Sequence, residues 1–158
     1  MSPVASRVTD RGERWRRWRP RSKLKPRHAV VAVDTNVVVR LLTGDEPRQT
    51  TRARSLFERE TVLLPTTVLL ETEWVLRRLY GLDVLRIVDA LAALIALPNV
   101  RCEHVGTVTI ALDWARAGLD FADALHLAGG RAAERFVTFD AKFVKRAKRI
   151  PDLCVALV

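Results

Sequence analysis

The chain has 158 residues, of which 49% are hydrophobic and 28% are charged, and its formal net charge is +9. This length and composition indicate one soluble, globular domain with a buried core. They argue against a membrane protein, because the most apolar long run, 84–97, contains Arg86 and Asp89.

Most of the positive charge lies in the first segment, 1–27. It contains ten Lys or Arg residues against two acids, so eight of the nine net charges fall there. The segment is too poor in apolar residues to pack a core and is predicted to be a disordered tail. Two interpretations stay open: an RNA-binding arm, with Arg on phosphates and Trp15 and Trp18 stacked on bases, or a segment without function, including an artefact of gene-start assignment.

The expected location is the cytoplasm. The segment 1–27 lacks the apolar stretch of a signal peptide. Cys102 and Cys154 are far apart in the sequence and have apolar neighbours, so they are expected to be buried thiols in a reducing compartment.

After residue 28, apolar runs typical of buried strands alternate with amphipathic helical patterns. The expected elements, in chain order, are a strand at 29–34, helices at 35–42 and 45–60, a strand at 61–64, helices at 66–80 and 82–97, a strand at 100–105, helices at 107–118 and 120–134, a strand at 135–139, a helix at 140–148 and a strand at 153–158. Asp45 is expected to cap the second helix, with Pro47 in its first turn, and Gly81 is expected to end the third. This alternation predicts an α/β domain over 28–158, with a mostly parallel sheet and helices on both faces.

Two acids directly follow predicted strands: Asp34 after AVVAV and Asp140 after RFVTF. Ligands of open parallel sheets bind beyond the carboxyl ends of the strands, which makes both acids candidate site residues. Each also precedes a helix, so helix capping alone would explain either one.

Two further acids lie within predicted helices. Glu71 has large apolar neighbours in the sequence, which implies a desolvation cost unless something compensates its charge, and Glu73 is expected to be the solvated acid on the opposite side. Asp123 lies three residues after Asp120, a spacing that a capping box would explain. His126 shares the face of Asp123 and is interpreted as structural.

Together, these acids suggest one metal site. Carboxylates that converge repel one another unless a cation neutralises them, and an all-oxygen set suits Mg²⁺, with Mn²⁺ as a possible substitute. The three histidines are not spaced for a zinc site.

At these residues the chain resembles a known family. The stretches AVDTNVVVRLL, LLETEWVLRR, GLDFADALHLA and VTFDAKF resemble, in order, the four acidic motifs of PIN-domain ribonucleases, and more closely those of VapC-type toxins of bacterial toxin–antitoxin pairs. The resemblance implies a PIN-like three-layer α/β/α sandwich, a Mg²⁺-dependent endoribonuclease, a homodimer and a cognate antitoxin. It implies catalytic and metal-binding roles for four acids and supporting roles for three more residues: Asp34, Glu71, Asp123 and Asp140, supported by Asn36, Thr138 and Asp120.

Other functions predict different sequence features. A phosphorylation receiver would have an acidic pair after its first strand, and a dehalogenase-type phosphatase would have an Asp-x-Asp motif, whereas Asp34 is followed by Thr35 and Asn36. The main alternative is a non-catalytic RNA-binding module that uses the basic tail, whose binding would survive EDTA. The basic residues after Asp140 are candidate contacts to RNA phosphates or a solvated helix face; they are Lys142, Lys145, Arg146, Lys148 and Arg149.

Overall fold

The computed structural model describes residues 30–151 and 153–158, so the basic tail of the sequence lies outside the part described. The chain forms two compact units that divide between Glu103 and His104, and each unit is described by itself. The described residues of both units fall within 28–158, and the assignment of that segment to one nuclease domain stays a prediction.

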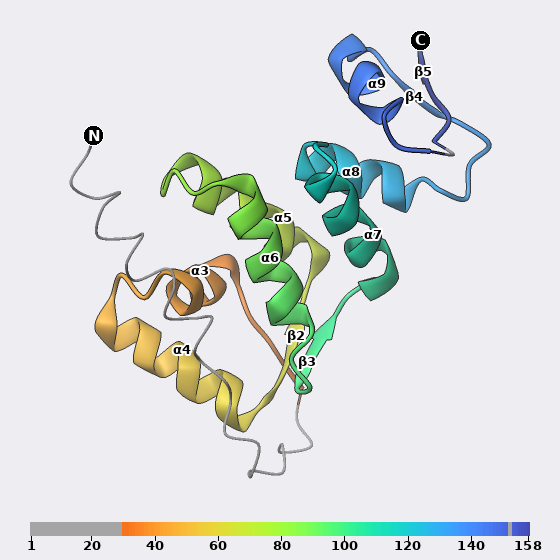
Figure 1. The fold of residues 1–158 in the computed structure, drawn as a ribbon. Coiled ribbons are helices and arrows are strands. Elements are labelled where there is room, and N and C mark those ends of the chain that lie inside the picture. The colour runs from red at the N-terminus through yellow and green to blue at the C-terminus, as the bar shows by residue number, and fades with distance from the viewer. Residues whose placement is uncertain (1–29, 152) are drawn as a thin grey trace. The chain divides into compact units, whose positions relative to one another are not determined.

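The first unit alternates strands and helices (Figure 1). Its elements are β1 (Val30–Ala32), α3 (Thr35–Thr43), α4 (Pro47–Arg59), β2 (Thr61–Leu64), α5 (Thr66–Arg78), α6 (Val84–Ile95) and β3 (Val100–Cys102). The three strands are parallel in the order β1-β2-β3, with Val31 opposite Val62 and Val62 opposite Val100. Both crossovers advance across the sheet in the same direction, so the right-handed rule places their helices on the same face.

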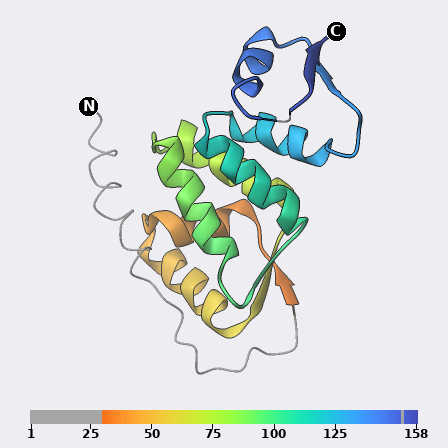
Figure 2. The same ribbon diagram turned by 45° about the vertical axis from the view of Figure 1, so that its right-hand side comes forward.

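Helix α5 shows how the core of this unit is built. Its buried residues are Leu69, Thr72, Glu73 and Leu76, which recur at the spacing of one helix face. Helix α6 packs against it and buries Ile87, Val88, Ala90, Leu91 and Leu94. Helices α3 and α4 lie side by side in the same unit (Figure 2).

Two predicted helix ends in this unit are wrong. The N-cap of α4 is Glu46 and not Asp45, because the Asp45 carboxylate accepts hydrogen bonds from Arg40, Thr43 and Tyr80 instead. Helix α5 has its C-cap at Leu79, before Gly81, which takes the left-handed conformation (φ 64°) in the turn that follows.

The second unit consists of α7 (Val105–Arg116), α8 (Phe121–Gly129), β4 (Phe136–Thr138), α9 (Ala141–Ala147) and β5 (Val155–Leu157). Helices α7 and α8 pack together, and β4 pairs with β5 in parallel. Phe136 of β4 and Phe143 of α9 form an edge-to-face pair with ring centroids 5.7 Å apart, which anchors α9 on this sheet.

Several expected elements are shorter than predicted. Helix α8 ends at Gly129 and not at residue 134, since Gly129 and Gly130 are poor helix formers. Strand β3 ends at Cys102, and His104, with φ 51°, turns the chain into α7.

The prediction of parallel strands is confirmed, because all three strand pairs of the described residues are parallel. The prediction of buried thiols is wrong for Cys154, which is exposed, and Cys102 is half-buried. Burial raises the pKa of the Cys102 thiol to about 11. Among residues 30–151 and 153–158, no helix has the length and apolarity needed to cross a bilayer.

Candidate active site

Asp34 lies at the junction between β1 and α3. Its backbone is extended, and its side-chain Oδ1 accepts a hydrogen bond from the Val37 backbone N–H at 3.0 Å, so it is the N-cap of α3. The side chain is exposed. The cap fixes the orientation of the carboxylate and leaves Oδ2 as the oxygen available to a ligand.

Thr35, which was not among the predicted site residues, connects this junction to Glu71. The Thr35 hydroxyl donates a hydrogen bond of 2.5 Å to Oε2 of Glu71 on α5, across a sequence separation of 36 residues. Thr35 is buried and Glu71 is exposed. The first and second acidic motifs are therefore in contact, and the position of Thr35 directly after Asp34 was the only sequence signal for this role.

The assignment of Glu73 as the solvated acid of α5 is wrong. Glu73 is only 2% exposed, and it accepts hydrogen bonds from Arg77 Nε at 2.6 Å and Nη2 at 3.4 Å. Glu71 has apolar neighbours in sequence, but neighbours in sequence point in different directions on a helix. Glu73 lies on the buried face, where an ion pair compensates its desolvation, and Glu71 lies on the exposed side, where a ligand can reach it.

In the second unit, Asp140 and Thr138 form a local cap at the end of β4. The Asp140 carboxylate accepts hydrogen bonds from the backbone N–H groups of Lys142 at 2.7 Å and Phe143 at 3.0 Å, and caps α9. The backbone N–H of Phe143, followed by that of Lys142, holds the pKa of Asp140 below its ordinary value. The Asp140 backbone N–H donates a hydrogen bond to the Thr138 hydroxyl at 3.0 Å, so Thr138, which was expected to support Asp140, contacts its backbone.

Asp123 lies in the first turn of α8, near two other carboxylates of the same unit. Burial, and then the charge of Asp120, raises the pKa of Asp123 above its ordinary value; Asp140 adds to this rise, and Arg146 opposes it. Asp120 caps α8 through the Ala122 backbone N–H at 3.0 Å. Arg146 of α9 donates a hydrogen bond to Asp123 Oδ2 at 3.3 Å, so the guanidinium of Arg146 forms an ion pair with this candidate acid.

The donor chemistry fits a hard divalent cation. The candidate ligands are all carboxylates, the set that Mg²⁺ and Mn²⁺ prefer. Burial, followed by the negative charge of Asp120 and Asp140, raises the pKa of Asp123, and a bound cation would favour the ionised carboxylate. Within the described parts of the chain, no group of three or more His, Cys, Asp or Glu side chains could by itself hold a metal ion. The structure thus joins the acids in two sets, Asp34 with Glu71 through Thr35, and Asp123 with Asp120 and Asp140.

Asn36 completes the predicted site residues. It lies in the first turn of α3, is exposed, and lines a cavity of about 350 Å³ together with Asp34. The side-chain amide of Asn36 and the carboxylate of Asp34 therefore line the same cavity.

The chain matches a known protein family over most of its length. The model of the PIN domain family matches residues 31–149, a range that contains Asp34, Glu71, Asp123 and Asp140. Among solved structures, the chain is similar to one titled crystal structure of VapBC2 from Rickettsia felis bound to a DNA fragment from their promoter, with a TM-score of 0.33 and 15% identity over 82% of this chain and 98% of that chain. No curated protein matches the chain. The family match and the parallel strand pairing confirm the predicted PIN-like α/β fold class, and the chain belongs to the PIN domain family.

Proposed function

We propose that this PIN domain is a divalent-metal-dependent endoribonuclease that acts as the toxin of a bacterial toxin–antitoxin pair. PIN domains are generally nucleases that bind divalent metals, which supports the hydrolase assignment. The observation that carries the proposal is the position of Asp34 and Asp140, which follow the parallel strands β1 and β4 at their carboxyl ends. The four motifs that resemble VapC-type toxins support the finer assignment.

Four acids are proposed as the metal-binding and catalytic set: Asp34, Glu71, Asp123 and Asp140. When bound, Mg²⁺ or Mn²⁺ lowers the pKa of a coordinated water and neutralises charge that develops on the phosphate.

The chain's own residues orient these carboxylates. Backbone N–H groups fix the carboxylates of Asp34 and Asp140 as helix caps, and the Thr35 hydroxyl holds that of Glu71. Such supporting hydrogen bonds reduce the number of orientations that a ligand must select from. The guanidinium of Arg146 forms an ion pair with the carboxylate of Asp123.

The surface charge of the second unit supports an RNA substrate. Helix α9 and the residue pair after it present four exposed bases to solvent: Lys142, Lys145, Lys148 and Arg149. These bases would attract the phosphates of an RNA chain, with an affinity that falls as the salt concentration rises. Hydrolysis then adds water across one phosphodiester P–O bond. The water oxygen attacks phosphorus, and the ester oxygen of the broken bond leaves.

The proposed partners are a cognate antitoxin and a second copy of this chain in the cytoplasm. Both come from the toxin resemblance. Exposed apolar side chains on the first unit are compatible with protein contacts: Trp74 is 50% exposed, Leu79 is 68% exposed and Leu85 is 53% exposed. Sedimentation analysis at several concentrations tests the homodimer, and rescue of growth by the neighbouring gene tests the antitoxin.

Cleavage of RNA by the purified chain, with Mg²⁺ or with EDTA, tests the enzymatic function. Asp34→Asn should abolish cleavage, because the neutral amide no longer offers a charged oxygen to a cation. Asp83→Asn is the matched control, because Asp83 is also an N-cap carboxylate, that of α6, through the backbone N–H groups of Leu85 and Arg86.

The two variants separate loss of a cap from loss of a ligand. Asp83→Asn should cleave RNA at the parent rate, with a similar change in the free energy of unfolding. Equal activity of the two variants would reject the role of Asp34. Binding of RNA that persists in EDTA without any cleavage in Mg²⁺ would favour the alternative, a non-catalytic RNA-binding module.

A further inference from the structure

A cavity of about 350 Å³ lies between α3 and α4, immediately beside Asp34. This volume is at the lower end of the range of small-ligand pockets. Three apolar side chains line it: Val37 of α3, and Ala53 and Leu56 of α4. The cavity belongs wholly to the first unit of the chain.

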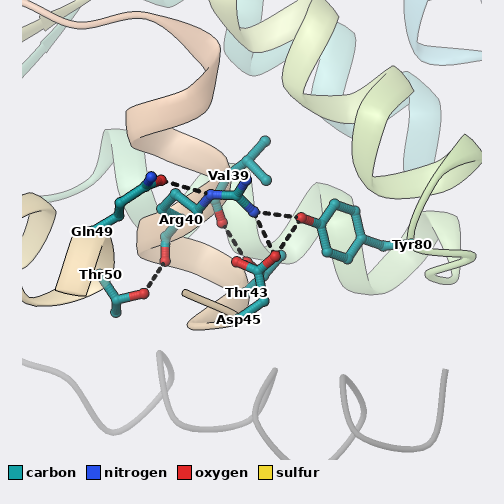
Figure 3. A network of polar contacts seen from close by, with 7 residues as sticks. All are labelled: Val39, Arg40, Thr43, Asp45, Gln49, Thr50 and Tyr80. Atoms are coloured by element: carbon teal, nitrogen blue, oxygen red, sulfur yellow. Dashed lines mark hydrogen bonds and ion pairs between the residues drawn. The ribbon is translucent and has the colours of Figure 1, made fainter. Parts of the chain in front are cut away.

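Hydrogen bonds between α3 and α4 hold the cavity open in a fixed shape. Arg40, near the end of α3, donates from Nε to Gln49 Oε1 at 3.0 Å, and its carbonyl accepts from the Thr50 hydroxyl at 3.1 Å (Figure 3). The same guanidinium is anchored by Asp45 at 2.5 Å and by the Tyr80 hydroxyl at 2.9 Å. A pocket fixed in this way loses little conformational entropy when a ligand enters.

Besides the carboxylate of Asp34, the polar side chains around the apolar walls carry planar donor groups. The carbonyl oxygen of Gln49 is already used by Arg40, so the NH₂ group is what its side chain offers a ligand. Asn36 contributes a second amide, and Arg52 contributes an exposed guanidinium that forms no ion pair with the described residues. Amides bond the edges of bases, and Arg planes stack on their faces.

The position beside Asp34 selects the occupant. A nucleotide next to the scissile phosphate would bring a flat, largely apolar ring with polar edges to this place, together with a phosphate that suits Arg52. An extended protein segment would also need partners for its backbone N–H and C=O groups, whereas most of this wall is apolar. We infer that the cavity between α3 and α4 is a subsite for one unpaired base of the RNA substrate; this rests on the proposed function of the neighbouring acids.

The test compares an RNA oligonucleotide with versions that lack one base. Each version carries an abasic nucleotide at one position near the cut. One such position should lower kcat/KM roughly 5- to 150-fold, the usual effect of losing one stacked base. The variant Ala53→Met fills the cavity and should cleave intact and abasic RNA at equal rates.

Arg48→Gln is the control, because Arg48 is an exposed base of the same helix that does not line the cavity. It should keep the difference between intact and abasic RNA. Should Ala53→Met fail to fold by circular dichroism, Leu56→Trp fills the cavity from a half-buried position on the same helix. A difference that survives in the filled variant overturns the subsite and makes a protein segment the occupant to test.

Binding in EDTA keeps this test separate from the proposed function. Fluorescence anisotropy with the same oligonucleotides should show tighter binding of intact than of abasic RNA by the parent, and no difference for the filled variant. If the parent cleaves no RNA in Mg²⁺ but shows this pattern, the nuclease proposal fails and the subsite stands. If cleavage occurs but no abasic position changes the rate or the binding, the subsite fails and the nuclease proposal stands.

Discussion

The contact between Thr35 and Glu71 gives the sharpest prediction about the site. Thr35→Val replaces the hydroxyl by a methyl group of similar size, so the buried volume is kept and one hydrogen bond is lost. A hydrogen bond to a charged group contributes about 1.5–3 kcal/mol when it is shielded from water. Glu71 is exposed, and water replaces part of this contact, so we expect the free energy of unfolding to fall by about 1 kcal/mol.

The functional effect should be larger than this loss of stability suggests. The hydroxyl orients a proposed ligand, and loss of such a supporting contact typically lowers metal affinity or activity about 10- to 100-fold. Isothermal titration with Mn²⁺ measures the affinity without RNA, and the Mg²⁺ dependence of cleavage measures the activity. Thr35→Ser keeps the hydroxyl and should stay close to the parent in both.

A double-mutant cycle with Glu71→Gln completes the test. If Thr35 acts through Glu71, the two changes together should cost little more than the larger single effect. Mn²⁺ affinity and cleavage of Thr35→Val within twofold of the parent would refute the reasoning, because the hydroxyl would then not orient a ligand.

Three further predictions concern the polar contacts around the site. Tyr80→Phe removes the hydroxyl that donates to Asp45 at 2.7 Å and accepts from Arg40 at 2.9 Å, and should lower the free energy of unfolding in urea by about 1–2 kcal/mol; no change would contradict a stabilising network. Burial raises the pKa of Asp45, but hydrogen bonds from Tyr80, Thr43 and Arg40 outweigh it, so the folded-state pKa lies below the ordinary 3.8. The contribution of Asp45 is therefore complete above about pH 4 and is lost as the pH falls through the folded value, and urea titrations at several pH values should show a smaller dependence in Asp45→Asn than in the parent. Arg146→Met removes the partner of Asp123 and should lower stability by up to about 1 kcal/mol without metal; saturating Mg²⁺ should reduce this difference, and a difference that Mg²⁺ leaves unchanged would show that Arg146 does not share its acid with a cation.

The sequence alone predicted features that depend on neighbours a few residues apart. Strand and helix positions followed from hydrophobic spacing, and Asp34 and Asp140 were recognised as acids that follow strands and precede helices. Both are N-caps with bonds to groups two or three residues away. Such short-range contacts are set by local backbone geometry, so spacing is enough to predict them.

The face of α5 was decided only by packing. Glu71 and Glu73 are both acids in the same helix, and a single helix can turn either one toward the core. The contacts of α5 with α3 and α6 bury Glu73, which pairs with Arg77, and expose Glu71. Apolar neighbours in the sequence could not reveal this, since the buried face depends on which other helices pack against it.

Partners distant in the sequence were likewise set by tertiary structure. Asp45 was expected to cap a helix, but a tyrosine 35 residues away and Arg40 take its oxygens. The contact of Thr35 with Glu71 spans 36 residues, and that of Arg146 with Asp123 spans 23. The sequence thus determined which acids this PIN domain carries and at which element ends they lie, because those features are local; the fold decided which side chains support them, because only packing brings distant segments within hydrogen-bonding distance.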